Sequence, residues 1–357
     1  LEGTVSGLQT GDLVLVYEGS TLVGPAEVSG NSWTLQLTGL TEGSHTYTAV
    51  IVDAAGNSGT SSSPFTLTVD LTPPTTGNAV AITSYIDDVD PQVGEFGSGT
   101  PTNDPEPVLK GTVSGLQTGD IVRIYQGSTL LGTARLDGRG GWTYQLSALL
   151  AGVYTFTAVI ADAAGNEGTR SADFNLSVDF TAPASTAALS AITEDTGLLD
   201  DDFITADQTL IFSITTTGAI EAGDKVQISL DNGTTWLDAT FNLATGTWQY
   251  DNTANTLAEG THTVLTRVTD AAGNPGTAQS ETVTIDLSVP DAVPTVTHFS
   301  DNFGSYQNAV LPSGSYTDDK TPELHGTLDR TLQTGERLAV YQGTVFLGYA
   351  EVSGQSW

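Results

Sequence analysis

The same passage of sequence recurs along this chain, and this repetition limits its architecture more than any other feature. GTVSGLQTGD at 3–12 recurs identically at 111–120, and TYTAVIVDAAGN at 46–57 returns as TFTAVIADAAGN at 155–166. A more divergent TVLTRVTDAAGN lies at 263–274, and LQTGDIVRIYQGSTLLG at 116–132 returns as LQTGERLAVYQGTVFLG at 332–348. Neighbouring copies are therefore about 108 residues apart. Solenoid units have only ~20–50 residues, so each copy is predicted to be a whole domain in a tandem array.

The repeat divides the chain into four segments. We name them repeat one (1–72), repeat two (73–181), repeat three (182–289) and repeat four (290–357). A complete copy of ~100 residues can bury its own hydrophobic core. We expect repeat one to lack its beginning and repeat four its last third. Together with the absence of Met, this predicts a segment of a longer polypeptide.

The composition excludes several classes of partner. The chain has 42 acidic and 10 basic residues, a formal net charge of −32 and no cysteine. Such a charge argues against direct binding to nucleic acid or to an anionic membrane. Disulfides and thiolate metal sites are excluded, and no apolar run reaches the ~20 residues needed to insert into a membrane. The acidity indicates either solubility, as in a salty habitat, or bound divalent cations.

Short alternating segments rich in Val, Thr, Ile and aromatic residues predict an all-β chain. In repeat two we predict strands at 79–86, 107–114, 120–126, 129–136, 141–147, 153–162 and 172–179. Seven strands with hairpin-sized gaps favour an immunoglobulin-like β-sandwich. The Pro-containing linkers at 69–76, 178–186 and 285–294 are expected to be stiff spacers that arrange the sandwiches end to end as a rod.

Comparison of the copies assigns the faces of the strands. Arg123 and Lys225 must point to water, which turns Val122, Ile124, Val226 and Ile228 inward. Arg267 occupies the slot of Val159, so that Phe156, Ala158 and Ile160 are predicted to face the core. Four tryptophans, Trp33, Trp142, Trp248 and Trp357, share one slot and are predicted to anchor the core.

Alternating strand directions place the loops at two poles of each sandwich. We call the pole where the chain enters the leading pole and the pole where it leaves the trailing pole. The long loop after the first strand lies at the trailing pole beside the linker, and the DAAGN turn after the sixth strand lies at the leading pole. End-to-end stacking would then bring carboxylates together where repeats meet. The first junction is predicted to gather Asp70, Asp162 and Asn166; the second, Asp87, Asp88, Asp104, Asp179, Asp270 and Asn274; the third, Asp195, Asp200, Asp201, Asp202, Asp207 and Asp286.

Carboxylates gathered in one seam repel one another unless a cation neutralises them. Calcium suits such a set because it takes 6–8 oxygen ligands in flexible geometry, whereas zinc prefers His or Cys. Each element also has a plainer interpretation: DAAGN as a simple turn, Asp70, Asp179 and Asp286 as polar strand ends, and 200–202 as a solvated loop.

At these residues the chain resembles the bacterial immunoglobulin-like repeats of giant type I-secreted, RTX-type adhesins. The resemblance rests on Asp-Asp after the first strand, Thr-Asn-Asp or Thr-Asp-Asp before the second, the tryptophan turn, DAAGN and a terminal VD-x-T-x-P. It implies calcium at the junctions, a rigid rod and export to the surface or exterior of a Gram-negative cell. Repeat three departs from the pattern with Glu194-Asp195 and an inserted SLDNGTTW at 229–236, and repeat four has Asp301-Asn302.

No enzyme motif is present, and we predict no catalytic site. Of the four histidines, His45 and His262 share a slot that holds Tyr154 in repeat two, which argues against a catalytic or metal role there. The favoured hypothesis is a calcium-stiffened structural stalk of a secreted or cell-surface adhesin, with a host-cell or glycan receptor bound by other parts of the parent protein. The alternatives are repeats that themselves bind glycans or partner cells multivalently, and an accessory segment of a secreted hydrolase.

Overall fold

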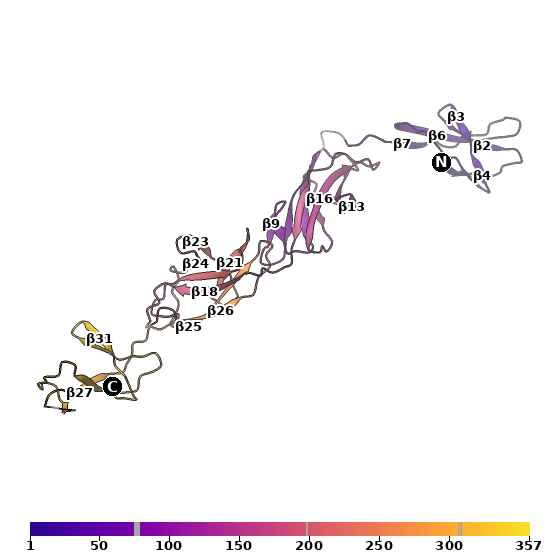
Figure 1. Ribbon diagram of the computed structural model, residues 1–357. Coiled ribbons are helices and arrows are strands. Elements are labelled where there is room, and N and C mark those ends of the chain that lie inside the picture. Colours follow the sequence, from indigo (N-terminus) through magenta and orange to yellow (C-terminus); the bar gives the residue numbers. More distant parts are fainter. Residues whose placement is uncertain (75–78, 198, 306, 308) are drawn as a thin grey trace. The chain divides into compact units, whose positions relative to one another are not determined.

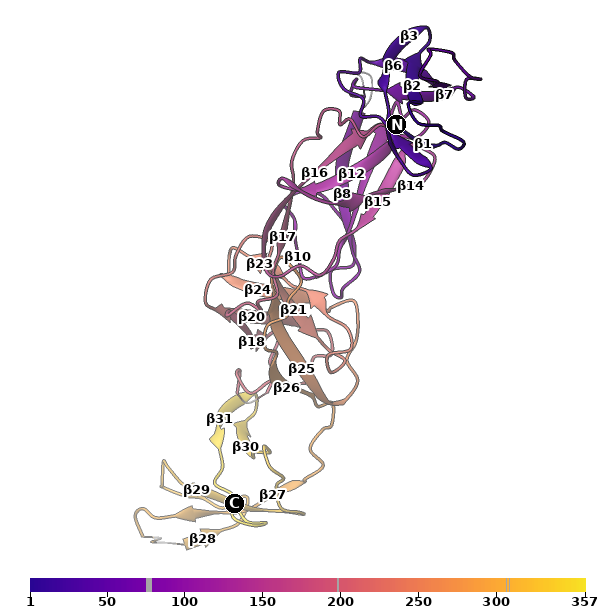
Figure 2. The same cartoon turned by 90° about the vertical axis from the view of Figure 1, so that its right-hand side faces the viewer.

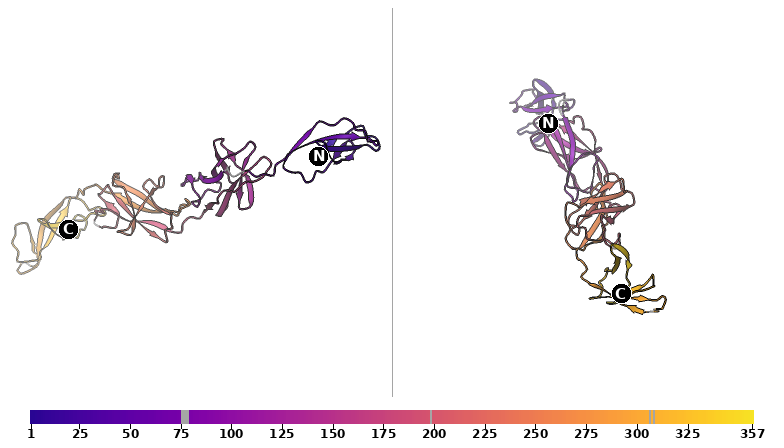
Figure 3. Two further views of the ribbon diagram at one scale, coloured as in Figure 1. Left: turned by 90° about the horizontal axis from the view of Figure 1, so that it is seen from above. Right: turned by 90° about the vertical axis from the view of Figure 1, so that its left-hand side faces the viewer.

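The computed structural model describes residues 1–74, 79–197, 199–305, 307 and 309–357. Its ribbon contains arrows and no coiled segment in Figure 1, Figure 2 and Figure 3, so the described residues form an all-β structure, as predicted. Within these ranges no helix has the length and hydrophobicity that a bilayer crossing requires. The predicted linker at 69–76 extends past Pro74 into residues outside the described ranges.

The strands are short and follow one another through tight turns. Repeat one contains β1 (Glu2–Thr4), β2 (Leu13–Glu18), β3 (Thr21–Pro25), β4 (Glu27–Ser29), β5 (Ser32–Thr34), β6 (Gly43–Val52) and β7 (Phe65–Val69). Repeat two contains β8 (Ala79–Asp87), β9 (Gly94–Phe96), β10 (Pro101–Thr102), β11 (Val108–Ser114), β12 (Ile121–Gln126), β13 (Thr129–Thr133), β14 (Arg135–Leu136), β15 (Gly141–Gln145), β16 (Gly152–Ala161) and β17 (Phe174–Val178).

The remaining strands repeat this order. Repeat three contains β18 (Thr186–Ile192), β19 (Ile204–Thr205), β20 (Ile211–Thr217), β21 (Lys225–Ser229), β22 (Leu237–Asp238), β23 (Thr240–Asn242), β24 (Thr247–Asp251), β25 (Gly260–Thr269) and β26 (Gln279–Ile285). Repeat four contains β27 (Pro294–Asp301), β28 (Ala309–Leu311), β29 (Glu323–Leu328), β30 (Ala339–Gln342) and β31 (Val345–Tyr349).

Repeat two shows the complete sandwich. One five-stranded sheet has the order β10-β17-β16-β12-β13, and the other has the order β14-β15-β11-β8-β9. All seven predicted strands are present, with two differences. The loop predicted after the first strand contains two further short strands, β9 and β10. The predicted strand at 129–136 is two strands, because β13 pairs with β12 in one sheet while β14 pairs with β15 in the other. The chain changes sheet at Ala134, which is buried.

The core of repeat two lies between these sheets and follows the predicted alternation. Val122, Ile124, Phe156, Ala158 and Ile160 are at most 2% exposed and belong to one cluster. Burying a side chain of this size stabilises a fold by about 1.5–3 kcal/mol. In repeat three the corresponding Val226 and Ile228 are also fully buried.

Repeats one, three and four have related sheets. Repeat one has β1-β5-β4 and β3-β2-β6-β7; repeat three has β18-β20-β24-β23 and β19-β26-β25-β21-β22; repeat four has β28-β27-β29 and β30-β31. The chain divides into two compact units. The first comprises Leu1–Thr193, Ile211–Asn252 and Thr263–Thr282, and the second comprises Glu194–Leu210, Thr253–His262 and Val283–Trp357. Each is described by itself below.

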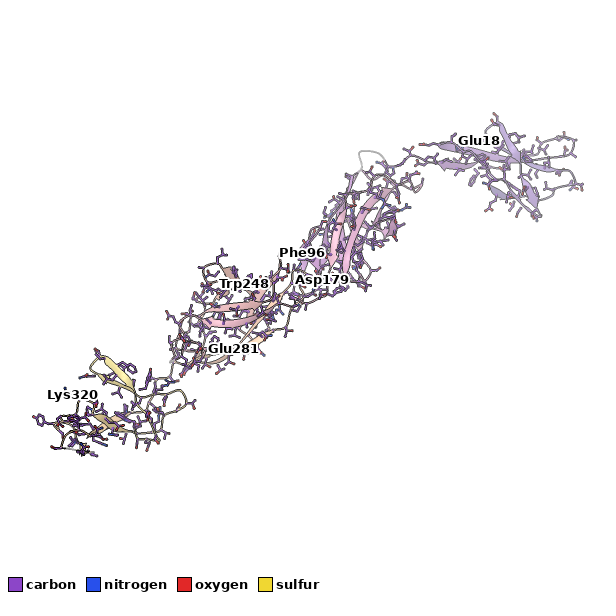
Figure 4. All side chains as sticks on the ribbon, in the orientation of Figure 1. Glu18, Phe96, Asp179, Trp248, Glu281 and Lys320 are labelled. Atoms are coloured by element: carbon purple, nitrogen blue, oxygen red, sulfur yellow. The ribbon has the colours of Figure 1, made fainter. Side chains whose placement is uncertain are left out.

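The tryptophan slot is buried to different degrees. Trp142 is 2% exposed, and its indole N–H donates a hydrogen bond to the carbonyl of Thr112 (3.1 Å). Its ring lies against Gly111, where an added Cβ would be 2.2 Å from the indole. Trp248, labelled in Figure 4, is only partly buried; its register partner is Ile214, and the Phe241 ring packs edge-on to it. Trp33 and Trp357 also lie against a glycine, Gly3 and Gly326, but are only partly buried, so among the described residues the predicted anchor is fully buried in repeat two alone.

Candidate metal sites where repeats meet

The DAAGN turn closes on its own aspartate. In repeat three Asp270 accepts hydrogen bonds from the backbone N–H groups of Ala272 (2.9 Å) and Asn274 (2.8 Å), and from the Asn274 side-chain amide (2.9 Å). Asp162 and Asn166 form the equivalent turn in repeat two. The simple-turn interpretation therefore describes the local geometry correctly.

The same turn also binds the linker that precedes its repeat. The side-chain amide of Asn166 donates to the backbone carbonyl of Asp70 (3.0 Å), and that of Asn274 donates to the backbone carbonyl of Asp179 (2.9 Å). The prediction that the turn of one repeat meets the end of the previous repeat is thus confirmed at the first and second junctions. The atom that meets the turn is a backbone oxygen of the linker aspartate.

Each linker aspartate organises the chain that follows it. The carboxylates of Asp70, Asp179 and Asp286 each accept a hydrogen bond from the backbone N–H two residues later, at 2.9–3.0 Å. Such turns are the local chemistry expected of aspartate at a strand end. They fix the path of the backbone where it leaves each sandwich.

The long loop of repeat two contains a buried pair of carboxylates. Asp87 is 0% and Asp104 3% exposed, and Thr102 connects them. The Thr102 hydroxyl donates to Asp87 Oδ2 (2.5 Å) and accepts from the backbone N–H of Asp104 (3.0 Å). Burial raises the pKa of Asp87 above its ordinary value, although the hydrogen bond from Thr102 acts in the opposite direction and the nearby Asp104 and Asp88 raise it further. In the described part of the chain, neither buried carboxylate is ion-paired with a Lys or Arg.

This loop lies beside the linker and the next DAAGN turn. Parallel pairing of β10 with β17 places Thr102 beside Val178, and the backbone N–H of Asp179 donates to the Thr102 carbonyl (2.9 Å). Asp179 is labelled in Figure 4. A Cβ added to Gly273 of the next repeat would be 3.2 Å from Gln92 Cβ and 3.4 Å from the side-chain nitrogen of Asn103. The loop, linker and turn of the second junction are therefore in contact.

The Thr-x-Asp arrangement recurs in the later repeats. In repeat three Thr205 donates to the carbonyl of Glu194 (2.6 Å) and accepts from the N–H of Asp207 (3.0 Å). In repeat four Thr317 donates to Asp301 (2.6 Å) and accepts from the N–H of Asp319 (3.0 Å). Asp301 is fully buried, although its sequence context, Asp-Asn, departs from the Asp-Asp of repeat two.

Among the described residues of these loops, two oxygen atoms are buried without a hydrogen-bond partner. They are Oδ1 of Asn103 in repeat two and Oδ1 of Asp195 in repeat three. Burial of an unsatisfied polar atom costs free energy, and such atoms are rare in folded proteins. Both therefore mark positions where an ordered water molecule or a bound ion would complete the bonding.

The predicted ligands differ in how they are placed. Asp87, Asp104 and Asn274 are buried; Asp162, Asn166, Asp179, Asp195, Asp207 and Asp270 are half-buried; Asp70, Asp88, Asp200, Asp201, Asp202 and Asp286 are exposed. Among the described residues, no three His, Asp or Glu side chains converge closely enough to form a preformed metal cluster. Some of the predicted ligands therefore lie near one another and others do not, and their role in binding an ion stays a prediction.

In the second unit, an arginine accompanies the acids of the third junction. Arg330 contacts Asp291 (2.5 Å) and makes two bonds to Glu336 (2.6 and 2.7 Å). The hydrogen bonds from Arg330, and after them one from the backbone N–H of Gln333, lower the pKa of Glu336 to about 2. They border a groove of about 840 Å³ that also includes Asp202 and Asp286. A guanidinium therefore supplies positive charge near two of the acids predicted for the third junction.

Thr102 and Asn103 are part of the Thr-Asn-Asp motif noted in the sequence, but the motif by itself assigned neither of them a role. The signal that could have assigned one is the Thr-x-Asp spacing, which recurs at 102–104, 205–207 and 317–319. The histidine slot, by contrast, has a clear structural role. His45, Tyr154 and His262 each place a side-chain polar atom 2.7–2.9 Å from the backbone carbonyl four residues earlier.

The bacterial Ig-like domain family matches residues 4–71, 86–180 and 181–287, which together make up most of the chain. The chain belongs to this family. Its bacterial Ig-like domains therefore carry the turn, linker and loop described above as parts of one recurring sandwich. A search of curated proteins found no match.

Solved structures match this chain at low similarity. Fibronectin(III)-like modules of Clostridium thermocellum CbhA are 15% identical, cover 58% of this chain and 94% of their own, and give a TM-score of 0.37. A structure described as concerning a 1.5-MDa bacterial ice-binding adhesin is 20% identical, covers 79% and 88%, and gives 0.28. A tetra-tandem repeat from the extending region of a large adhesion protein is 19% identical, covers 92% and 76%, and gives 0.20.

Proposed function

We propose that these bacterial Ig-like domains form a stalk segment of a large secreted or cell-surface adhesin, stiffened by calcium ions where repeats meet. The observation that carries the proposal is the buried pair Asp87 and Asp104, which lies beside the unsatisfied oxygen of Asn103. Buried carboxylates without a cationic partner are costly, and a bound cation removes that cost.

The donor atoms suit calcium. The second junction offers carboxylate oxygens from Asp87, Asp88 and Asp104, the amide oxygen of Asn103 and backbone carbonyls of the linker. Calcium binds 6–8 oxygens of these kinds, and its flexible geometry tolerates ligands from separate loops. An ion held there would supply positive charge to the loop acids and link the loop of one repeat to the linker and turn of the next.

The tandem organisation supports a mechanical role. Near-identical domains joined by short Pro-containing linkers would hold the receptor-binding part of the parent protein at a distance from the cell. We place the parent protein outside a bacterial cell, exported by type I secretion, with receptor binding assigned to other parts of it. The stalk requires no catalysis by these repeats.

Calcium should raise the unfolding temperature of the chain, because an ion that binds only the folded state stabilises it. At a free concentration of ~100 times Kd the gain is about 2.7 kcal/mol for one site. Calorimetry and small-angle scattering in calcium and in chelator would measure the stability and the particle length together. Identical curves in the two conditions would contradict the ionic proposal.

Substitution of Asp87→Asn separates ion binding from folding. In chelator the variant should be at least as stable as the wild type, because the substitution removes a buried charge whose pKa is raised. In calcium it should gain less stability, because calcium selects for carboxylate charge. The exposed Asp173→Asn variant of the same repeat is the matched control. Equal destabilisation by Asp87→Asn in both conditions would assign Asp87 a purely structural role.

A further inference from the structure

Two of the four histidines face each other across adjacent strands of repeat four. His298 in β27 and His325 in β29 are register partners in an antiparallel pair, and Figure 2 shows these strands next to each other. Their ring centroids are 4.8 Å apart, and the ring planes differ by 15°. Both side chains are half-buried, so one edge of the pair is open to solvent.

The neighbouring side chains orient both rings. The Thr297 hydroxyl lies 2.9 Å from Nδ1 of His298, and the Ser300 hydroxyl lies 2.8 Å from Nε2 of His325. Each contact uses one ring nitrogen and leaves the other free of protein partners within the described residues. Glu323 is the register partner of Ser300, and its carboxylate lies 3.7 Å from Nε2 of His325.

The other repeats show that the sandwich does not need imidazoles here. The equivalent register partners in repeat two are Ser84 and Lys110. Both pairs lie next to a β-bulge, and in both repeats a threonine hydroxyl donates to the backbone carbonyl of the facing residue. In repeat three the pair is Ala191 and Ser213. The histidine pair is therefore a local feature of repeat four.

We propose that His298 and His325 form a cross-strand chelating site for a divalent transition-metal ion, with zinc as the ion best suited to it. Imidazole nitrogen is a preferred ligand of zinc, and a hydroxyl that accepts a hydrogen bond from one ring N–H leaves the other ring nitrogen unprotonated and able to bind. Calcium requires oxygen ligands, so this site is chemically separate from the junction sites proposed above.

Binding requires a change in the orientation of both rings, whose planes now differ by only 15°. Two Zn–N bonds of ~2.0–2.1 Å in a tetrahedral site place the nitrogens ~3.3 Å apart. The rings must therefore tilt toward each other from their stacked arrangement. No three ligands are gathered at one point in the described residues, so the pair supplies two ligands. Rotation of the exposed Glu323 side chain would supply a third, and water would complete the set.

Zinc titration followed by imidazole NMR tests the proposal on the whole chain. The chain is first saturated with calcium, so that oxygen-rich sites are filled. Resonances of His298 and His325 should then shift with zinc, while those of His45 and His262, whose rings contact backbone carbonyls, should not. The single substitution His325→Ser should lower the zinc affinity of this site about tenfold or more.

The matched variant carries His298→Ser together with His325→Lys, which reproduces the pair of repeat two. It should fold with unchanged strand content and lose the zinc-dependent change entirely. Zinc affinity equal to that of the wild type would overturn the proposal. Zinc binding that leaves the His298 and His325 resonances unmoved would also overturn it, because the ion would then occupy acidic sites only. The variant should lose the zinc-dependent shifts of the imidazole resonances and keep the calcium-dependent rise in unfolding temperature. The failure of either proposal can therefore be recognised separately.

Discussion

At the scale of single residues, a glycine lets the repeated tryptophan pack directly against the backbone of the neighbouring strand. Gly3, Gly111 and Gly326 each lie under the indole of their own repeat, where an added Cβ would be 2.2–2.6 Å from the ring. The third repeat has Ile214 opposite its tryptophan; Trp248 is partly buried, as are Trp33 and Trp357, whereas Trp142 is 2% exposed. The pair of glycine and tryptophan is therefore a unit of packing, with the indole replacing the missing side chain.

Substitution of Gly111→Ala should destabilise repeat two by about 1–3 kcal/mol, the usual cost of overpacking a core. The new methyl would also lie 2.1 Å from the carbonyl of Ala81, which belongs to the backbone and cannot move away freely. In a domain of ~100 residues each 1 kcal/mol lowers the unfolding temperature by about 4–8 °C. The control is Gly97→Ala in the same repeat, where a Cβ meets nothing. Equal unfolding temperatures of the two variants would contradict the packing argument.

Sequence alternation predicted which side chains face the core but not every buried one. Val159 occupies an outward slot and is nevertheless 0% exposed. Its register partner Arg123 is held by Glu167 (2.9 Å), and a long side chain fixed along a sheet can cover its neighbours. Burial of this kind depends on side-chain contacts between residues distant in sequence, and the alternation of polar and apolar residues does not predict those contacts.

At the scale of elements, the insertion in repeat three is a hairpin closed by one carboxylate. Asp231 accepts hydrogen bonds from the Ser229 hydroxyl (2.8 Å) and from the N–H and hydroxyl of Thr235 (2.8 and 2.6 Å). Asn232 adopts a left-handed φ of 59°, and the N–H of Gly233 donates to Ser229 (2.8 Å). These bonds, chiefly the one from the Thr235 hydroxyl, lower the pKa of Asp231 from 3.8 to about 2.

The hairpin should therefore lose stability in acid. A carboxylate with a lowered folded pKa stabilises the fold above its unfolded pKa of 3.8, and this contribution disappears as the pH falls toward about 2. Asp231→Asn should remove this pH-dependent part, and hydrogen exchange of residues 229–236 between pH 5 and pH 2 would measure it. Asp173→Asn, an exposed change in repeat two, should leave the profile unchanged. If Asp231→Asn kept the wild-type pH dependence of hydrogen exchange, other titrating groups would be responsible for the acid sensitivity of the hairpin.

The order and type of the strands could be predicted from the sequence, but the change of sheet within 129–136 could not. That segment reads as one continuous β pattern, since only a single buried residue, Ala134, separates β13 from β14. The partners of the two halves lie on different sheets. Pairing between segments distant in sequence decides where a strand divides.

At the scale of the whole molecule, the rule of alternating poles correctly brought the DAAGN turns to the preceding linkers. It predicted side chains as the meeting atoms, whereas the contacts use the backbone carbonyls of Asp70 and Asp179. Chain direction determines which loops become neighbours. The atoms that meet depend on local turns, and here the linker aspartates direct their carboxylates into turns of their own.

Removal of the Asn274 side chain should loosen the second junction without unfolding either repeat. One lost hydrogen bond of about 1 kcal/mol corresponds to roughly fivefold faster opening of the linker. Hydrogen exchange at residues 179–182 would measure this in Asn274→Ala. The matched control is Asn57→Ala, because Asn57 makes the same bonds to Asp53 within its turn and contacts no linker in the described residues. Unchanged exchange in Asn274→Ala would assign the linker's order to its proline or to a bound ion.

At the first and second junctions the acceptor is a backbone carbonyl, which every amino acid provides, and the donor is an asparagine carried by the following repeat. The linker can therefore drift in sequence, as from Leu71 to Phe180, without losing the bond. Unequal recombination that adds or deletes one whole period of about 108 residues leaves each remaining joint with its own donor and acceptor. A gene built this way can change the length of its product in discrete steps, with no compensating mutation needed at the new boundary.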